Sequence, residues 1–83
     1  MVKNYMEILV CEILNEIKEG YPFLKNINYS NDVKSIALNN LPPMYFLSNI
    51  SEGEKKAFIL DRQKRIAVLS EIISAINIVT KNL

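Results

Sequence analysis

The segment that most limits how this chain can fold runs from Ser51 to Lys81 and has the pattern of one long helix. Ser51 and Glu54 have the S-x-x-E spacing of a capping box, which typically opens a helix. Apolar side chains then recur at seven-residue intervals, as they do in a coiled-coil seam. These residues are Ile59, Ile66 and Ile73 in one row and Leu69, Ile76 and Leu83 in another. The pattern predicts an uninterrupted helix to about residue 81, roughly 30 residues long.

This helix has more apolar surface than the rest of so short a chain can cover. Further apolar residues widen the seam until only a narrow polar strip remains. A helix that is apolar around most of its circumference has to be covered on more than one side. We therefore expect its second half to pack on a second copy of the chain; the alternative is that it fills the core of a monomer. The residues expected in the dimer contact are Ile66, Leu69, Ile73 and Ile76.

The composition of the chain excludes two features that commonly stabilise small domains, namely disulfides and bound zinc. The chain has 83 residues, enough for a single domain over residues 1–83, and a monomer of this size is expected to be marginally stable. Cys11 is the only cysteine and histidine is absent, so no internal disulfide can form and there is no Cys/His set for zinc. No metal or other cofactor is expected, and oligomerisation is the support that remains.

Two shorter helices are expected before the long one. Apolar residues spaced by three and four predict the first over residues 5–19, with Asn4 as its N-cap and with Gly20 and Pro22 after its end. Residues 21–30 have no clean period and are expected to form a loop.

The second helix is predicted to run from a cap at Ser30 or Asn31 to the proline pair Pro42 and Pro43. Prolines lack a backbone donor and push the preceding residue toward extended geometry, so residues 41–46 should form a stiff, extended corner. The sequence thus predicts an all-α fold, a small bundle of three to four helices with a long C-terminal helix, assembled as a dimer.

Membrane and nucleic-acid roles have little support in the composition. The N-terminal residues lead directly into an amphipathic, glutamate-containing helix pattern, unlike a signal peptide. The most apolar run, Ile66 to Val79, is too short to cross about 30 Å of hydrocarbon. The net charge of +1 gives no general attraction to phosphate backbones. We expect a cytoplasmic protein without membrane contact, and binding of nucleic acid is not expected.

The residues that would indicate an enzyme are missing. Without histidine, neither a Ser/His/Asp nor a Cys/His arrangement can form, and Cys11 beside Val10 is typical of a buried structural thiol. The acidic residues show no metal-ligand spacing, and the two glycines do not form a phosphate-binding loop. We therefore expect a protein without catalytic activity.

Positive charge is concentrated in the first half of the long helix. The residues are Lys55, Lys56, Arg62, Lys64 and Arg65. Guanidinium groups suit forked contacts to a phosphodiester, which Arg62 and Arg65 could make. The alternative is a solvated helix face with local ion pairs.

Three stretches resemble, in order, the late competence development ComFB family: Asn4 to Val10, Asn31 to Tyr45 and Asp61 to Lys64. The middle stretch is the most specific, because an Asp-Val helix start is followed at the family's offsets by an asparagine, a proline pair and a tyrosine. Its motif residues are Asn31, Asp32, Val33, Asn39, Leu41, Pro42, Pro43 and Tyr45. The resemblance covers nearly the whole chain.

The resemblance implies a small bacterial helical homodimer, named for a late competence operon whose other products handle DNA uptake. The function it first suggests is a non-catalytic regulatory or interaction module with a competence-related protein partner. Some cyanobacterial members are described as cyclic dinucleotide receptors, so cyclic di-GMP or cyclic di-AMP is an alternative ligand, with Arg62, Lys64 and Arg65 as its contacts. An accessory subunit of the DNA-uptake machinery is another alternative. A last one is a structural dimer in which Arg62 and Arg65 pair with Asp61 or Glu54.

One departure from the family concerns a metal. Many members carry a cysteine cluster, resembling a zinc site, just before the Asp-Val helix, where this chain has residues 24–30 without a cysteine. The resemblance therefore implies no metal here. Packing by Leu24, Ile27 and Tyr29 is expected to replace the cross-link.

Overall fold

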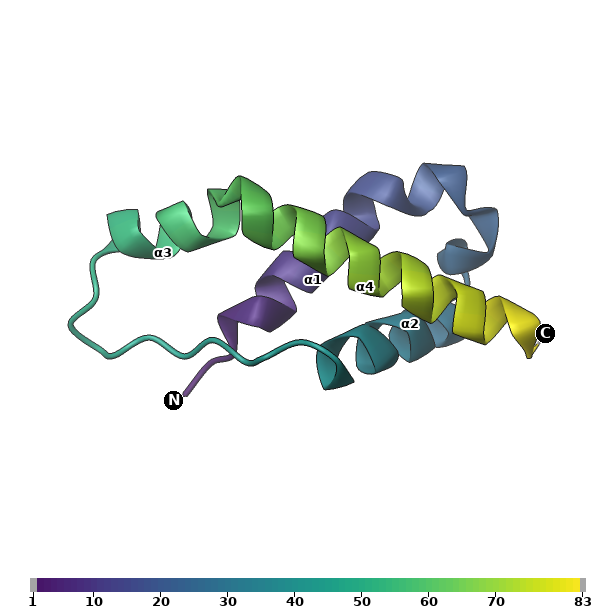
Figure 1. Cartoon of the computed structure of the whole chain (residues 1–83), viewed down its shortest axis with the longest axis horizontal. Coiled ribbons are helices and arrows are strands. Elements are labelled where there is room, and N and C mark those ends of the chain that lie inside the picture. The colour runs from purple at the N-terminus through teal and green to yellow at the C-terminus, as the bar shows by residue number, and fades with distance from the viewer. Residues whose placement is uncertain (1, 83) are drawn as a thin grey trace.

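The computed structural model describes residues 2–82, so Leu83 of the predicted heptad rows lies outside the described residues. Four α-helices form here: α1 (Tyr5–Ile17), α2 (Ile27–Asn39), α3 (Glu52–Leu60) and α4 (Arg62–Lys81). Two short 3-10 helices, η1 (Lys18–Gly20) and η2 (Pro22–Lys25), join α1 to α2. An extended connector of residues 40–51 joins α2 to α3 (Figure 1). The predicted all-α class is confirmed for the part of the chain described.

The core lies where α4 packs along both α1 and α2. Its fully covered side chains come from all three helices, because each presents apolar residues at three- and four-residue spacing. The central ones are Leu9, Val10 and Ile13 of α1, Val33 and Ala37 of α2, and Val68, Ile72 and Ala75 of α4. Because one face of α4 is used up in this way, the rest of its apolar surface lies on its flanks.

Helix α1 follows the prediction closely. Asn4 is its N-cap, and the Asn4 side-chain oxygen accepts from the backbone N–H of Met6 at 3.1 Å. The α-helix ends at Ile17, two residues before the predicted end, and tightens into η1. The same Asn4 oxygen also accepts from the N–H of Met44 in the connector, at 2.9 Å. One side chain therefore starts α1 and fixes the connector beside it.

Helix α2 begins earlier than predicted. Asn26, and not Ser30 or Asn31, is the N-cap, since its side chain accepts from the N–H of Asn28 at 2.9 Å. Residues 27–30, expected in a loop, are therefore the first turn of the helix, and the family's Asp-Val pair lies inside α2. The period is hidden here because Ile27, the first apolar residue, points to solvent with 67% of its surface exposed.

The packing expected to replace a zinc cross-link is present only in part. Leu24 is buried, and the rings of Tyr29 and Phe23 lie 6.0 Å apart between centroids. The expectation was wrong for Ile27, which does not take part in this packing. The early start of α2 turns its side chain outward.

The proline pair follows the end of α2, as predicted. The connector after it is held by backbone hydrogen bonds to the start of α1 and by ring contacts with α1 and α3. The carbonyl of Met44 accepts from the N–H of Tyr5 at 2.7 Å, while the Met44 N–H donates to Asn4. The ring of Phe46 stacks edge-on against Tyr5 at 4.9 Å and against Phe58 of α3 at 5.8 Å. The connector thus links the start of α1 to α3 through one aromatic cluster.

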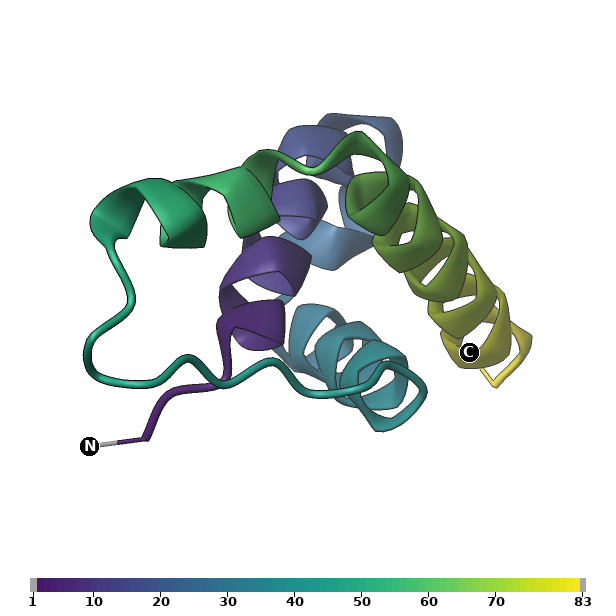
Figure 2. The same ribbon diagram turned by 60° about the vertical axis from the view of Figure 1, so that its left-hand side comes forward.

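The predicted long helix is broken at Asp61, which corrects the expectation of a single helix. Ser51 caps the first part as predicted, by accepting from the N–H of Glu54 at 3.2 Å. Asp61 then leaves helical geometry, with φ −62° and ψ 116°, and its carboxylate accepts from the N–H of Lys64 at 3.0 Å. Aspartate is among the most favoured N-cap residues, so a new helix starts at Arg62. Figure 2 shows α3 and α4 running in different directions from this break.

The double role of Asn4 gives a stability prediction. Replacing Asn4→Ala leaves two N–H groups without this acceptor and should lower the free energy of unfolding by about 2 kcal/mol in denaturant titration. Asn26→Ala is the matched control, because it removes only the exposed bond to Asn28 and should cost about half as much. Equal losses in the two variants would show that the bond to the connector contributes nothing.

Candidate functional site

The residues predicted for a dimer contact divide between the core and one exposed flank of α4. Ile76 is buried inside the single chain at 3% exposure, so it is covered without a partner. Ile66 and Leu69 keep 61% and 37% of their surfaces exposed, and Ile73 is half-buried. Spacings of three and four place Ile66, Leu69 and Ile73 on one side of the helix, which we call the apolar flank.

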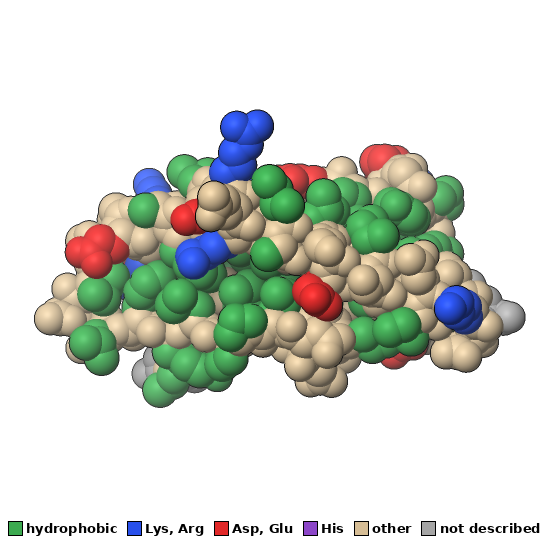
Figure 3. All heavy atoms as spheres, viewed as in Figure 1, with side chains coloured by type: hydrophobic (Ala, Val, Ile, Leu, Met, Phe, Trp, Pro, Cys, Tyr) green, Lys and Arg blue, Asp and Glu red, His purple; other side chains and the backbone are tan. Residues whose placement is uncertain are grey.

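A shallow pocket lies between the apolar flank and α1. Its volume is about 210 Å³, and Ile66 and Leu69 form one wall while Ile13 and Ile17 of α1 form the other. The polar residues at its edge are Glu16, Arg62 and Arg65. The apolar flank therefore continues from α4 onto α1. Figure 3 shows the molecular face that carries α4, on which apolar side chains are many and charged ones scattered.

Arg65 is engaged inside the chain. Its guanidinium donates to the carboxylate of Glu12 at 3.4 Å, to the carboxylate of Glu16, and to the carbonyl of Ile59 at 3.0 Å. The two carboxylates belong to α1 and the carbonyl to α3, so Arg65 ties three helices together. The expectation that it would pair with Asp61 or Glu54 was wrong, because the Asp61 carboxylate caps α4 instead.

The three predicted phosphate contacts do not converge. Arg62 and Arg65 lie at the same shallow pocket, but Lys64 is two residues from Arg62 and so lies about 200° around the helix from it. The Lys64 ammonium sits 5.6 Å from the centre of the Phe58 ring and borders a different pocket, of about 290 Å³, that Pro42 and Pro43 also line. The other arginine at the flank, Arg62, has an exposed side chain. It takes part in none of the ion pairs among the described residues.

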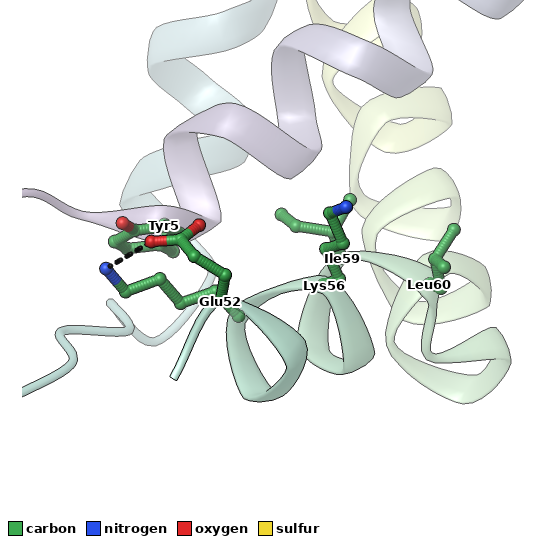
Figure 4. Close-up of a pocket in the computed structure, with 6 residues that line it drawn as sticks. Tyr5, Glu52, Lys56, Ile59 and Leu60 are labelled. Atoms are coloured by element: carbon green, nitrogen blue, oxygen red, sulfur yellow. Dashed lines mark hydrogen bonds and ion pairs between the residues drawn. The ribbon is translucent and has the colours of Figure 1, made fainter. Parts of the chain in front are cut away.

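A second group of cations, at the N-terminal half of α3, was not recognised from the sequence as a site. A pocket of about 350 Å³ lies between Tyr5 of α1 and α3, and its other lining residues are Glu52, Lys55, Lys56, Ile59 and Leu60 (Figure 4). The Lys55 ammonium is 5.7 Å from the centre of the Tyr5 ring and 3.3 Å from the Glu52 carboxylate. No local signal could reveal this pocket, because Tyr5 and α3 are brought together only by the tertiary fold.

The Tyr5 hydroxyl and the Glu52 carboxylate also stabilise the charged form of Lys55. A hydrogen bond to Tyr5, followed by one to Glu52, raises the pKa of Lys55 above its ordinary value. The Glu52 carboxylate also neutralises part of the charge of the Lys55 ammonium. The second lysine of the pocket, Lys56, is exposed.

The motif residues of the middle stretch serve mainly to build the fold and the connector surface. Val33 is buried in the core, and Leu41 is half-buried against it. Asn31, Asp32 and Asn39 are exposed on α2. Pro42, Pro43 and Tyr45 are exposed on the connector. Their pattern therefore marks the end of α2 and the extended segment after it.

Among residues 2–82, the structure has neither a cluster of metal-ligating side chains nor a helix suited to span a membrane. Over residues 2–82, no group of three or more histidine, cysteine, aspartate or glutamate side chains is placed to hold a metal ion. Within the same range, none of the helices combines the length and the apolar character that a membrane span requires.

The fold and these surfaces define a small all-α domain whose exposed features are an apolar flank and pockets bordered by cations. The family model for late competence development protein ComFB matches residues 3–83, nearly the whole chain, so the protein belongs to the ComFB family. The resemblance seen in the sequence is confirmed, and membership supports a role related to late competence. Comparisons with curated proteins and with solved structures give no match.

The contacts of Arg65 predict a difference between the two arginines of the flank. Arg65→Ala removes bonds to α1 and α3 from a side chain that is 22% exposed, and should lower the free energy of unfolding by about 1–2 kcal/mol. Arg62→Ala, on the same helix, should change it by less than about 0.5 kcal/mol. Denaturant titration of both variants measures the difference. A neutral Arg65→Ala would show that these ion pairs do not hold the helices together.

Proposed function

We propose that this ComFB-family protein is a non-catalytic interaction module that works as a homodimer, with the apolar flank as its contact between copies. The observation that carries the proposal is the exposure of Ile66 and Leu69 beside Ile17 of α1. Large aliphatic side chains gathered on one side of a small protein are the usual core of a protein contact.

The spacing of the apolar flank suits a second helix. Ile66, Leu69 and Ile73 follow one another at intervals of three and four, which is the spacing by which one helix meets another in a coiled-coil seam. A twofold dimer places the same patch on both sides of the contact, so the flank of one copy would face the flank of its partner.

Charge at the flank is compatible with such self-association. Arg65 is paired with two carboxylates, those of Glu12 and Glu16, and the positive charge of Arg62 offsets the remaining negative charge, so these four groups together are neutral. The whole chain has a net charge of only +1, so two copies repel each other little. Burying the flank would also add apolar contacts to a chain whose own core is small.

A binding role fits the chemistry of the pockets better than a catalytic one. Apolar atoms make up most of the surface of the pockets beside Tyr5 and the apolar flank, and Lys55 and Arg65 are held in ion pairs with carboxylates. Such groups can position a partner, while proton transfer would first have to break those pairs. The regulatory partner of the dimer would then be recognised by surfaces that remain open, such as the connector and the pocket beside Tyr5.

Two of the alternative functions, a cyclic dinucleotide receptor and an accessory subunit of the DNA-uptake machinery, have no specific observation in their favour. A cyclic dinucleotide receptor needs cations directed at two phosphates, whereas Arg62 and Lys64 lie on opposite flanks and Arg65 is paired. An accessory subunit that contacts DNA needs a concentrated basic face. Calorimetric titration with cyclic di-GMP and cyclic di-AMP tests the first of these. Binding that is lost in both Arg62→Ala and Lys64→Ala would favour it over the interaction module.

The homodimer proposal predicts a sharp effect of charge on the apolar flank. Leu69→Glu should make the protein monomeric in size-exclusion chromatography with light scattering, because it places two carboxylates in the centre of the contact. Ile78→Glu is the matched control: Ile78 is similarly exposed, at 45%, but nine residues along α4 puts it about half a turn away from Leu69. This control should keep the mass of the wild type.

Two results would contradict the proposal. One is a wild-type protein with the mass of a single chain, 9.5 kDa, at all concentrations. The other is a dimer that Ile78→Glu disrupts and Leu69→Glu does not, which would place the contact on the opposite side of α4.

A further inference from the structure

The break between α3 and α4 is unusually short and is not imposed by the backbone chemistry of its residues. It consists of Asp61 alone, between Leu60 and Arg62, with neither glycine nor proline at these positions. The apolar heptad row of Ile59, Ile66 and Ile73 continues across it. Nothing in residues 60–62 therefore prevents an uninterrupted helix.

Side-chain contacts hold the bent form in place of helical backbone bonds. The Asp61 carboxylate accepts from the N–H of Lys64, and the Arg65 guanidinium donates to the carbonyl of Ile59. A straight helix would give up both contacts. It would instead join the N–H groups of Arg62, Gln63 and Lys64 to the carbonyls four residues earlier, at Phe58, Ile59 and Leu60. The two forms thus satisfy the polar groups of the break in different but comparable ways.

A single copy cannot straighten without losing part of its core. Phe58 of α3 packs on Phe46 of the connector, which in turn packs on Tyr5, while Ile72 and its neighbours hold α4 against α1 and α2. These two sites fix the direction of each helix, and Figure 2 shows that the directions differ. If α3 keeps its place and the helix straightens, α4 leaves its own site on α1 and α2. The vacated site is then complementary to one available segment, the α4 of another copy.

We propose that a second copy of this chain supplies that α4, so that two chains exchange α4 and each α3–α4 pair becomes one straight helix. The proposal rests on the homodimer proposed above and specifies how its two copies are joined. All core contacts of α4 are then remade between copies, which is why exchange of identical elements is a low-cost route to a dimer. A hinge this short favours exchange over a closed monomer.

Exposed apolar side chains beside the break would be covered in the exchanged dimer, and their burial would stabilise it. Leu60 and Ile66, on either side of Asp61, are 69% and 61% exposed in the single chain. In the exchanged dimer the two straight helices pass each other near Asp61, which brings Ile66 close to the partner copy. Ile59 joins Ile66 and Ile73 in one continuous row, which matches the coiled-coil seam of the sequence.

A proline at position 62 is compatible with the bent form but not with the straight helix. In the bent form residue 62 is the first residue of α4, where proline is well tolerated, and Asp61 already has the extended ψ of 116° that a following proline requires. In a straight helix the same proline removes the bond to Phe58 and clashes with its carbonyl. Arg62→Pro should therefore weaken dimerisation about 100-fold or more while the monomer stays folded. Arg62→Ala controls for the loss of the guanidinium and should dimerise as the wild type does.

Asp61→Ala acts in the opposite direction. It removes the cap of α4 and supplies the best helix former at the break, so the fraction of dimer at a given concentration should rise. Concentration-dependent light scattering on the full-length chain compares all three variants with the wild type.

Isotope-filtered nuclear Overhauser spectra identify the exchange directly. A mixture of ¹³C-labelled and unlabelled chains is unfolded and refolded together, and contacts between copies are recorded. Exchange predicts contacts across copies between the buried methyl groups of α4 and those of α1 and α2. A dimer whose contacts across copies are confined to the apolar flank, and which survives Arg62→Pro, would overturn the exchange and leave the homodimer intact. A wild type that is monomeric throughout would overturn both.

Discussion

The carboxylate of Asp61 determines where one helix ends and the next begins, and the packing on both sides depends on that position. By accepting from the N–H of Lys64 it lets α3 turn toward the connector, where Phe58 meets Phe46, while α4 takes its place on α1 and α2. Arg65 stabilises the same arrangement from the other side through Glu12, Glu16 and Ile59. In this arrangement Ile66 and Leu69 of α4 remain exposed, and they form the surface that we assign to the second copy.

The second constraint is the proline-containing connector, which lets so small a chain form one core. Pro42 and Pro43 end the helical region, and Asn4 and Tyr5 then bind both backbone groups of Met44. Side chains that alternate along this extended segment are packed inward at Met44 and Phe46 and exposed at Tyr45. In a chain without disulfides, these bonds and the aromatic cluster hold the connector, which carries the family-motif residues Leu41, Pro42, Pro43 and Tyr45.

Features that depend on local chemistry could be predicted from the sequence, whereas features that depend on distant contacts could not. Asn4, Ser51 and the proline pair are local signals, and each acts as predicted. The break at Asp61 was missed because helical periodicity runs through it and the contacts of Arg65 come from α1. The early start of α2 was missed because Ile27 is exposed and so does not reveal the period. The pocket beside Tyr5 likewise exists only after α1 and α3 meet, and Arg65 could be recognised as structural only once Glu12 and Glu16 were placed beside it.

In the proposed homodimer of this small helical ComFB-family domain, the surface left uncovered by one chain is covered by a second copy. Sedimentation equilibrium of the wild-type protein over a range of micromolar concentrations tests this most directly, because it gives the mass without a variant or a probe. The proposed homodimer should sediment as a species of twice the 9.5 kDa chain mass that dissociates only on dilution. A single species of 9.5 kDa over the whole range would contradict it and would make the apolar flank the free surface of a monomer.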